Sequence, residues 1–424
     1  MELSGYNAPP GDAEGRMAGE TSAGEVSIDD LGWFRDVLVY AKQRNATDII
    51  VVERRPVRLG ILKKCELMEN RAGVVVKPSK AEILSAIVET RQRKFKDETD
   101  ADPGTAIMKH IRAHGYFEYA FSVKDVGRFR MSVSSSQEGL GFAARVLPYT
   151  IPRLEDLDPY NLLAGIRSLF DFSYSYPRGL ILHTGVVGSG KTTLIASELD
   201  YLSEKMNGAV YTLEDPIEQE IEGVNQTQID TAGGLTFLSG LRTLLRQDPN
   251  VLVVGEVRDE ETAQTLVQAG LSGNLAISTI HSGTAAQVFA RLLHMGIEPF
   301  LLASAITGVV AQRLVRRLCR ACRRPRPLAS VESRIYFEEG RSPSEVFEPA
   351  GCPDCDHTGY RGRMAVFEVA VPDEALREAI LNRAPTAELH RVCVAAGMTP
   401  LLQAAAGHLR SGNTSIQEIG RVIA

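Results

Sequence analysis

The stretch Gly185-Val186-Val187-Gly188-Ser189-Gly190-Lys191-Thr192 decides the fold of this chain. It fits the pattern G-x-x-x-x-G-K-[ST] of a phosphate-binding loop. The apolar run Leu180-Ile181-Leu182 precedes it, and a helix-like segment at 193–206 follows it. Because a phosphate-binding loop joins a strand to a helix, this order is the required context. The sequence therefore predicts an α/β domain that binds a nucleoside triphosphate.

The residue types in this loop suit a phosphate chain. Its glycines allow backbone N–H groups to turn toward phosphate oxygens. Lys191 would reach the β- and γ-phosphates, and the Thr192 hydroxyl would hold Mg²⁺. The N-terminus of the following helix adds partial positive charge. The expected nucleotide-binding residues are Gly185, Gly188, Ser189, Gly190, Lys191, Thr192 and Thr193.

Length and composition limit the number of domains and the classes of protein to which this chain can belong. The 424 residues are enough for two or three domains, and the net charge of −6 gives no reason to expect nucleic-acid binding. No apolar stretch approaches the roughly 18 residues of a membrane span, and the N-terminus has no signal-peptide pattern. We therefore expect a cytoplasmic protein whose contact with any membrane is peripheral.

The chain before the loop divides into a tail, a small domain and a linker. Residues 1–26 have the composition of a disordered tail, and 27–150 predict a small α/β domain. The proline-containing segment 151–178 predicts a linker with a short helix near 161–170. Within the small domain, helices are expected at 28–44 and 81–95, and strands at 49–52, 58–62, 116–123, 128–134 and 141–147.

The rest of the chain predicts a nucleotide domain with two additions. Across 179–312, helix-like segments alternate with strand-like runs, which favours a parallel sheet with helices on both faces. Residues 313–369 carry two cysteine pairs, and 370–424 look helical. The strand-like runs lie at 180–184, 209–213, 251–254 and 275–279.

Acidic side chains follow two of these strands. Glu214 and Asp215 would face the nucleotide and orient water or Mg²⁺, because ligands bind outside the carboxyl ends of such strands. A turn with surface acids explains this pair equally well. Glu256 follows the buried run 251–254 and would act on the attacking water. Gly255 occupies the usual aspartate position, so Glu256 has to carry the role.

His281 ends another strand-like run and could contact the γ-phosphate. A structural role is the commoner one for a histidine at a strand end. The sequence alone therefore leaves both interpretations of His281 open.

Four of the six cysteines form two C-x-x-C pairs, Cys319 with Cys322 and Cys352 with Cys355. In a cytoplasmic protein this pattern indicates zinc rather than disulfides. The 29 residues between the pairs exceed the common spacing, so we expect an excursion there. Four thiolates leave no open coordination position, which makes the expected zinc structural.

An arginine-rich run at 313–326 contains seven arginines in 14 residues. It could contact nucleic acid, an anionic membrane surface or acidic residues of a neighbouring subunit. It lacks interleaved aromatic residues, which weakens the nucleic-acid interpretation. A solvated basic face is the commonest explanation for such a run.

Taken together, these motifs resemble the secretion ATPase superfamily, the hexameric motors of type II secretion and type IV pilus assembly. The resemblance runs from about residue 125 to the end of the chain. It rests on the phosphate loop, an Asp box at 212–218, a Walker B region at 241–259, a His box at 278–281, and the segments 295–300, 311–314 and 352–368.

This resemblance implies a fold and site roles. The fold would be a small PAS-like N-terminal domain followed by a RecA-like ATPase core, a four-cysteine zinc subdomain and a helical C-terminus. Glu256 would be the catalytic glutamate, with Glu214 assisting water or metal positioning and His281 as the His-box residue. Arg128 and Arg130 resemble arginines that reach the nucleotide when the N-terminal domain closes, and an arginine can stabilise charge on the transferring phosphoryl group. Arg145 competes for that role.

The resemblance also implies partners and a location. The protein would be a homohexamer that uses ATP, Mg²⁺ and Zn²⁺ and acts on an inner-membrane platform protein, with a cytoplasmic adaptor as a further partner and no nucleic acid. It would be cytoplasmic and peripherally associated with the inner membrane. Two other hypotheses remain open: a nucleotide-binding scaffold without turnover, and a retraction, DNA-uptake or DNA-dependent motor.

Some features depart from the family pattern. Val186-Val187 stands where Pro-Thr is usual, and Ser272-Gly273-Asn274 stands where Thr-Gly-His is usual. We expect the extra N-terminal module of many assembly ATPases to be absent, and the region around 47–49 and 128–130 looks more like retraction ATPases. The four cysteines point instead to the assembly and secretion branch, and we give them more weight because they define a whole subdomain.

Overall fold

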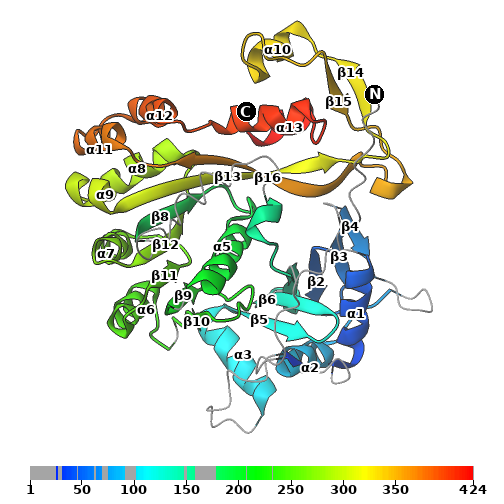
Figure 1. Ribbon diagram of the computed structural model, residues 1–424. Helices are drawn as coiled ribbons and strands as arrows, with labels where there is room; N and C mark the ends of the chain where they lie inside the picture. The colour runs from blue at the N-terminus through cyan, green and yellow to red at the C-terminus, as the bar shows by residue number, and fades with distance from the viewer. Residues whose placement is uncertain are drawn as a thin grey trace. The chain divides into compact units, whose positions relative to one another are not determined.

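A seven-stranded sheet lies in each of the two units into which the chain divides (Figure 1). The structure is a computed structural model that describes residues 25–26, 31–44, 46–61, 64–68, 75–90, 102–147, 150–157, 178–206, 208–231 and 233–423. Unit 1 comprises Met1–Ile151 with Pro216–Glu222, and unit 2 comprises Pro152–Asp215 with Gly223–Ala424. The expected tail up to residue 24 and the helix expected near 161–170 lie outside the described residues.

The sheet of unit 1 has the strand order β1-β5-β6-β7-β2-β3-β4. Neighbouring strands are antiparallel except for the parallel pair of β1 and β5. The strands are β1 (Glu25–Val26), β2 (Asp48–Val52), β3 (Arg58–Ile61), β4 (Lys64–Leu67), β5 (Tyr116–Val123), β6 (Gly127–Ser136) and β7 (Gly139–Leu147). The helices of this unit are α1 (Gly32–Gln43), α2 (Lys80–Thr90) and α3 (Pro103–His114).

Alternating burial explains why these strands form. In β5, every second residue is buried, as expected for a strand with one face on a core. Helix α1 packs an apolar stripe that includes Phe34 and Leu38 on that core. The ring of Phe34 lies 5.2 Å from that of Phe142 on β7 in an edge-on arrangement.

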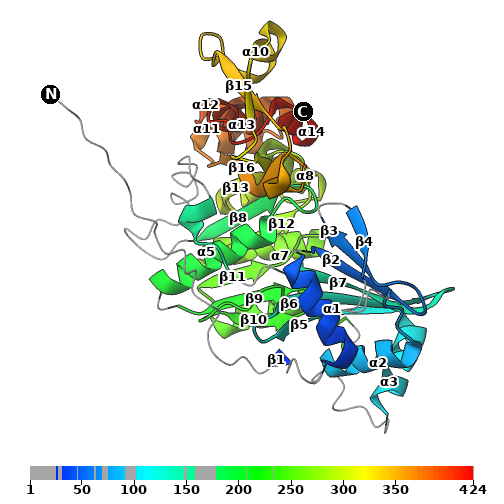
Figure 2. The ribbon, with the colours of Figure 1, turned by 90° about the vertical axis from the view of Figure 1, so that its right-hand side faces the viewer.

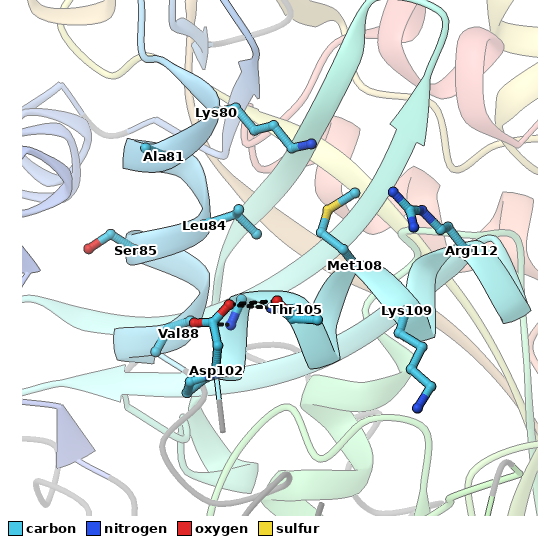
Figure 3. A pocket seen from close by; sticks show the side chains of 12 residues that line it. Lys80, Ala81, Leu84, Ser85, Val88, Asp102, Thr105, Met108, Lys109 and Arg112 are labelled. Atoms are coloured by element: carbon cyan, nitrogen blue, oxygen red, sulfur yellow. Dashed lines mark hydrogen bonds between the residues drawn. The ribbon is translucent and has the colours of Figure 1, made fainter. Parts of the chain in front are cut away.

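Helix α3 was not predicted from the sequence. It begins at Pro103, and the Asp102 side chain accepts hydrogen bonds from the backbone N–H groups of Gly104 and Thr105. This Asp-Pro start is a recognisable helix signal. A groove of about 710 Å³ between α2 and α3 combines apolar side chains such as Leu84 and Met108 with basic ones (Figure 3).

The sheet of unit 2 has the strand order β10-β9-β11-β12-β8-β13-β16. Its strands are parallel from β10 to β13, as predicted, and β16 is antiparallel to β13. The strands are β8 (Gly179–Thr184), β9 (Val210–Glu214), β10 (Asn225–Gln228), β11 (Val251–Val254), β12 (Leu275–Ile280), β13 (Ile306–Leu318) and β16 (Tyr360–Ala370).

Helices cover both faces of this sheet. Figure 1 shows α5 (Lys191–Lys205) on one face, and α6 (Phe237–Leu244) and α7 (Glu260–Leu271) on the other. Buried strands such as β11, with all four residues inaccessible, are typical of a parallel sheet covered in this way. Further helices of this unit are α8 (Ala285–His294), α9 (Pro299–Ala305), α11 (Glu374–Leu381), α12 (Thr386–Ala395), α13 (Leu401–Arg410) and α14 (Ile416–Val422).

Strand β13 crosses the boundary expected at residue 312. It pairs with β8 near the phosphate loop, continues along β16, and ends one residue before Cys319. Between the cysteine pairs lies the expected excursion, which we call the arm. It contains β14 (Arg324–Pro327), α10 (Ser330–Tyr336) and β15 (Glu345–Glu348), and Figure 2 shows it projecting from the rest of unit 2.

The arginine-rich run does not form one solvated basic face, so that expectation is wrong. Four of its seven side chains pair with separate acceptors within unit 2, because β13 and the arm place them in different surroundings. The pairs are Arg313 with the Gly283 carbonyl, Arg316 with Glu418, Arg323 with the Gly412 carbonyl, and Arg326 with Glu332.

Among the described residues, no helix has the length and apolar character needed to span a membrane.

Candidate nucleotide site and cysteine cluster

The phosphate loop connects β8 to α5, and glycine is required where the chain closes it. Gly190 lies in the left-handed region at φ +90° and forms the N-cap of α5. A Cβ atom there would lie 2.8 Å from Nε2 of Gln312 and 3.3 Å from Cδ1 of Leu314. The positive φ strains any residue with a side chain, and an added Cβ would require the ends of the Gln312 and Leu314 side chains to move. Gly188 also has a positive φ, but a Cβ there would meet no atom within 4 Å.

Lys191 is the first residue of α5, and its side chain folds back over the loop. Its Nζ donates to the Gly185 carbonyl at 2.8 Å. Burial lowers the pKa of Lys191, and the positive charge of Arg313 lowers it further, while the charge of Glu256 acts in the opposite direction. The neighbouring Thr192 side chain is exposed. Lys191 is thus held at the loop in the electrostatic field of Glu256.

Glu214 ends β9 and is held by its neighbours on two strands. Its Oε1 accepts hydrogen bonds from Oγ1 of Thr212 at 2.6 Å and from Nε2 of Gln226 at 2.9 Å. Thr212 and Gln226 are direct partners in the pairing of β9 with β10. Asp215, the next residue, lines a groove of about 580 Å³ together with Arg258. Glu214 is therefore fixed in orientation, whereas Asp215 is exposed.

Glu256 and His281 are brought together from adjacent strands. Glu256 follows β11 and His281 follows β12, and Oε2 of Glu256 lies 3.4 Å from Nε2 of His281. The Glu256 side chain is 20% exposed and also pairs with the guanidinium of Arg258. The Oγ1 of Thr279 donates to the Gly255 carbonyl at 2.8 Å, which ties the ends of the two strands together.

The surroundings of residue 255 explain why a glycine occupies this position. A Cβ atom there would lie 3.2 Å from the Leu213 carbonyl oxygen and 3.4 Å from the ring of Phe237. The separation from the carbonyl oxygen is tighter than ordinary van der Waals contact, and the ring lies at the limit of that contact, so a larger residue would push against β9. The carboxylate is accordingly found one residue later, at Glu256.

Three residues that the sequence did not assign to the site also contribute. The Oγ1 of Thr184 both donates to the Ser282 carbonyl and accepts from its N–H, at 2.9 and 2.8 Å. Nη2 of Arg313 donates to the Gly283 carbonyl at 2.7 Å, and Gln312 lies against the phosphate loop. The available signal was the polar pair 312–313, which directly follows the apolar residues 308–311.

The candidate arginines lie in unit 1 and pair with carboxylates of that unit. Nη1 of Arg128 donates to Oε1 of Glu220 at 2.8 Å. Arg130 pairs with Glu118 at 2.6 Å and Glu218 at 3.3 Å. Arg145, which lies opposite Arg130 in the β6–β7 pairing, pairs instead with Asp48 at 3.0 Å. Arg128 and Arg130 therefore share the acidic segment Pro216–Glu222, and Arg145 does not.

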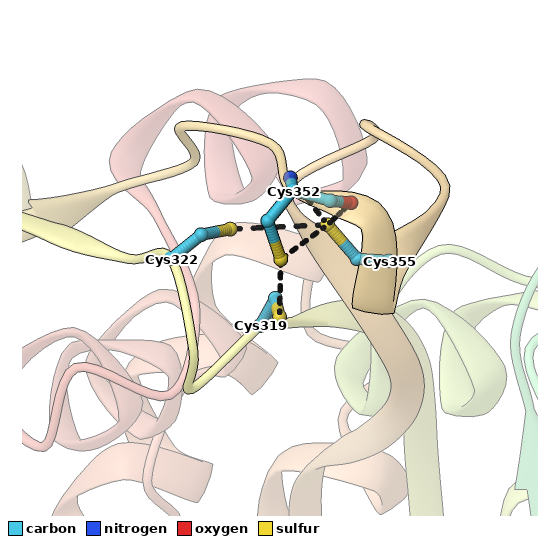
Figure 4. Close-up of side chains that lie close together, drawn as sticks. All are labelled: Cys319, Cys322, Cys352 and Cys355. Atoms are coloured by element: carbon cyan, nitrogen blue, oxygen red, sulfur yellow. Dashed lines mark hydrogen bonds between the residues drawn. The ribbon is translucent and has the colours of Figure 1, made fainter.

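The four predicted cysteines converge at the base of the arm (Figure 4). All four Sγ atoms lie within 4.8 Å of one another. Cys319 to Cys352 and Cys322 to Cys355 are each 3.8 Å between sulfurs, and Cys352 to Cys355 is 3.7 Å. A tetrahedron with metal–sulfur distances of about 2.3 Å has edges of about 3.8 Å. The cluster is therefore compatible with zinc.

Backbone N–H groups also point at this cluster. Those of Cys352 and Gly359 lie 3.3 and 3.2 Å from Sγ of Cys355. Such donors stabilise negative charge on sulfur, which is the form that binds a metal.

Three curated relatives match this chain over most of its length. Type II secretion system protein E of Aeromonas hydrophila is 42% identical over 294 residues, 69% of this chain and 58% of that protein. Type II secretion system ATPase E of Vibrio cholerae is 39% identical over 293 residues, again 69% and 58%. Type IV pilus assembly ATPase PilB of Myxococcus xanthus is 37% identical over 296 residues, 69% and 52%. The chain thus spans between half and two thirds of the length of these relatives.

Solved structures show the same fold at lower identity. The pilus retraction motor PilT with bound ADP has a TM-score of 0.65 and 23% identity, covering 90% of this chain and 94% of that one. The Legionella pneumophila ATPase DotB has a TM-score of 0.62 and 21% identity, covering 92% and 94%. The predicted α/β fold is confirmed. Residues 115–421 match the type II/IV secretion system protein family, and the chain belongs to that family.

Proposed function

We propose that this chain hydrolyses ATP and works as the motor of a type II secretion or type IV pilus machine, where it drives assembly of pilin-like subunits. One observation carries the proposal. Glu214 ends one strand of the parallel sheet, and Lys191, Glu256 and His281 each follow another, so that all four lie where the carboxyl ends of these strands meet. Membership of the type II/IV secretion system protein family and the names of the relatives support the choice of machine.

Each residue of this edge has a role in the proposed reaction. The loop N–H groups at Gly185, Gly188, Ser189, Gly190 and Thr193 and the Nζ of Lys191 bind the β- and γ-phosphates. Thr192 holds Mg²⁺, which neutralises charge on the phosphate oxygens. Glu256 orients the attacking water and accepts its proton, because its carboxylate lies just beyond the carboxyl end of β11.

Two further side chains assist Glu256 in this proposal. His281 restrains the Glu256 carboxylate and contacts the γ-phosphate, and Glu214 orients the water or the metal from the neighbouring strand. Arg128 and Arg130 supply positive charge to the transferring phosphoryl group when unit 1 closes. They do so by exchanging their carboxylate partners in 216–222 for phosphate oxygens.

The cysteine cluster is proposed to hold one structural zinc ion. Four thiolates at tetrahedral spacing fill its coordination shell and leave no position for substrate. We further propose the domain limits 1–26, 27–150, 151–178, 179–312, 313–369 and 370–424. The protein would be a cytoplasmic homohexamer peripherally associated with the inner membrane, acting on a platform protein, with a cytoplasmic adaptor as a further partner and without nucleic acid.

Two variants test the proposal through separate steps. Lys191→Ala should abolish turnover and weaken ATP binding, because the side chain belongs to the phosphate loop. Glu256→Gln should bind ATP normally and turn it over at least about 100-fold more slowly, a typical loss on removing such a group. Lys205→Ala is the matched control, since Lys205 lies in the last turn of the same helix α5 and is exposed.

Steady-state phosphate release and binding of a fluorescent ATP analogue are the measurements. An unchanged turnover rate in Lys191→Ala would sink the assignment. Wild-type protein that binds ATP without releasing phosphate would instead indicate a scaffold. Stimulation of turnover by DNA, and not by fragments of the platform protein, would indicate a DNA-dependent motor.

A further inference from the structure

Glu368 is a buried carboxylate that two helix N-termini share. It lies on β16, and the residue is 1% exposed. Its Oε1 accepts from the N–H of Ala285 at 2.8 Å, and its Oε2 accepts from the N–H of Leu401 at 3.2 Å. Ala285 is the first residue of α8, and Leu401 is the first residue of α13. A carboxylate is favoured there because both helices present unsatisfied N–H groups and partial positive charge.

The α8 side of this contact leads directly to His281. Residues 281–284 connect His281 at the end of β12 to the start of α8. Within this short loop, Thr184 holds both backbone groups of Ser282, and Arg313 holds the Gly283 carbonyl. Glu368 then fixes the first N–H of the helix. The backbone after His281 is therefore held at three successive points.

Arg313 and Glu368 belong to one arrangement. In the antiparallel pairing of β13 with β16, Ala311 lies opposite Glu368, which places Arg313 two residues along on the same face. Burial lowers the pKa of Arg313, and the charge of Glu368 opposes that change. A buried guanidinium needs such a counter-charge, so Glu368 also supports the residue that holds Gly283.

We propose that Glu368 is a positioning residue for ATP hydrolysis. Together with Arg313 it fixes the loop 281–284, so that His281 holds Glu256, and through Leu401 it connects this loop to helix α13. The inference rests on the proposed ATPase function. A shift of about 1 Å in such a positioning contact is enough to slow a reaction about 100-fold. A displacement of α13 would therefore change the position of the Glu256 carboxylate.

The competing explanation is that Glu368 only stabilises the fold. Glu418 on α14 provides the matched comparison, because it is a fully buried carboxylate of the same unit with arginine partners away from the loop 281–284. The same substitution at both positions separates loss of stability from loss of positioning. Gln at 368 keeps the shape of Glu but turns an NH₂ group toward one of the two helix N–H donors.

The test compares purified full-length variants below their unfolding temperatures. Glu368→Gln should lower kcat for ATP about ten-fold or more while KM for ATP stays within about two-fold, because the phosphate loop itself is unchanged. Glu418→Gln should keep kcat within about two-fold of wild type. Equal kcat values in Glu368→Gln and Glu418→Gln would overturn the inference, whereas an inactive wild type would overturn the proposed function.

A double-mutant cycle with His281→Ala provides a readout that a structural role would not change. If Glu368 acts through His281, Glu368→Gln should lower kcat by no more than about two-fold in the His281→Ala background. A full ten-fold effect in both backgrounds would refute the positioning role. Should Glu368→Gln not fold, Arg313→Met removes the donor to Gly283 and is expected to give the same non-additive pattern. Additive losses for that variant would equally refute the inference.

Discussion

Replacing Glu418 by glutamine should destabilise unit 2 by about 2 kcal/mol at pH 7. Glu418 lies on α14 with a fully buried side chain, and it joins that helix to β13. Its carboxylate accepts from the backbone N–H of Arg316 at 3.0 Å and from the guanidiniums of Arg316 and Arg421 at 2.6 and 2.5 Å. Glutamine would keep the shape but present an NH₂ group to these donors.

The magnitude follows from the pKa of Glu418. Burial alone would raise it, but hydrogen bonds from Arg421 and Arg316 together outweigh burial and lower it from 4.5 to about 2. A shift of about 2.5 pH units corresponds to about 3.4 kcal/mol. The Arg316 and Arg421 side chains are 38% and 43% exposed, so solvent screens the attraction. We therefore expect about 2 kcal/mol rather than the full value.

The pH dependence has a definite sign. Because the pKa of Glu418 in the folded state lies below its ordinary value, the stabilisation is complete above about pH 4.5 and is lost as the pH falls toward 2. Protonated Glu418 closely resembles glutamine. The stability gap between wild type and Glu418→Gln should thus shrink to about 1 kcal/mol near pH 3.

Thermal unfolding followed by circular dichroism measures this gap. At pH 7 the variant should unfold about 4–8 °C lower than wild type, as expected for a unit of this size. Glu388→Gln is the control, because Glu388 pairs with Arg391 in an exposed helix pair and should change stability by less than about 0.5 kcal/mol. The reasoning fails if Glu418→Gln and wild type unfold at the same temperature at pH 7, or if their difference in stability is equally large at pH 7 and pH 3.

Two further predictions concern the metal cluster and the phosphate loop. Metal analysis of the reduced, purified protein should find about one zinc per chain. Cys355→Ser should lose the zinc, whereas Cys393→Ser should retain it, because Cys393 is a buried cysteine outside the cluster. Reduced wild-type protein without zinc would refute the thiolate site. Gly190→Ala should weaken binding of a fluorescent ATP analogue about ten-fold, the equivalent of about 1.4 kcal/mol. Gly188→Ala should weaken it less, because a Cβ there adds backbone strain but no contact within 4 Å; equal losses would contradict the steric argument.

The sequence predicts those elements whose pattern is local. Strand β5 occupies the predicted residues 116–123, because its alternation of apolar and polar residues is sufficient by itself. The phosphate loop is flanked by β8 and α5 as its motif requires. The cysteines that converge are the predicted four, because their C-x-x-C spacing places each pair in one turn.

The same reasoning fails where partners are distant in the chain. Strand β13 contains Arg313, Arg316 and Arg317, and such a run predicts an exposed basic segment. Its partners lie elsewhere: Gly283 accepts from Arg313, and Glu418 accepts from Arg316. No pattern within the strand predicts these contacts, so the sequence alone favoured solvent-exposed arginines.

The candidate site shows the same division. Glu214, Glu256 and His281 could be singled out because each follows an apolar strand. Thr184 and Glu368 could not, since their importance depends on the loop 281–284 reaching them through the fold. The roles of Arg128 and Arg130 remain predictions.

Strand β13 also constrains how the length of this chain can vary. Side chains alternate along a strand, so Gln312 and Arg313 serve opposite faces, one against the phosphate loop and the other toward the loop 281–284. Insertion or deletion of a single residue before this pair would exchange their faces and displace Cys319 as well. The arm between Cys322 and Cys352 has no such register to keep with the main sheet. Length variation is therefore tolerable in the arm and not in the strand that leads to it.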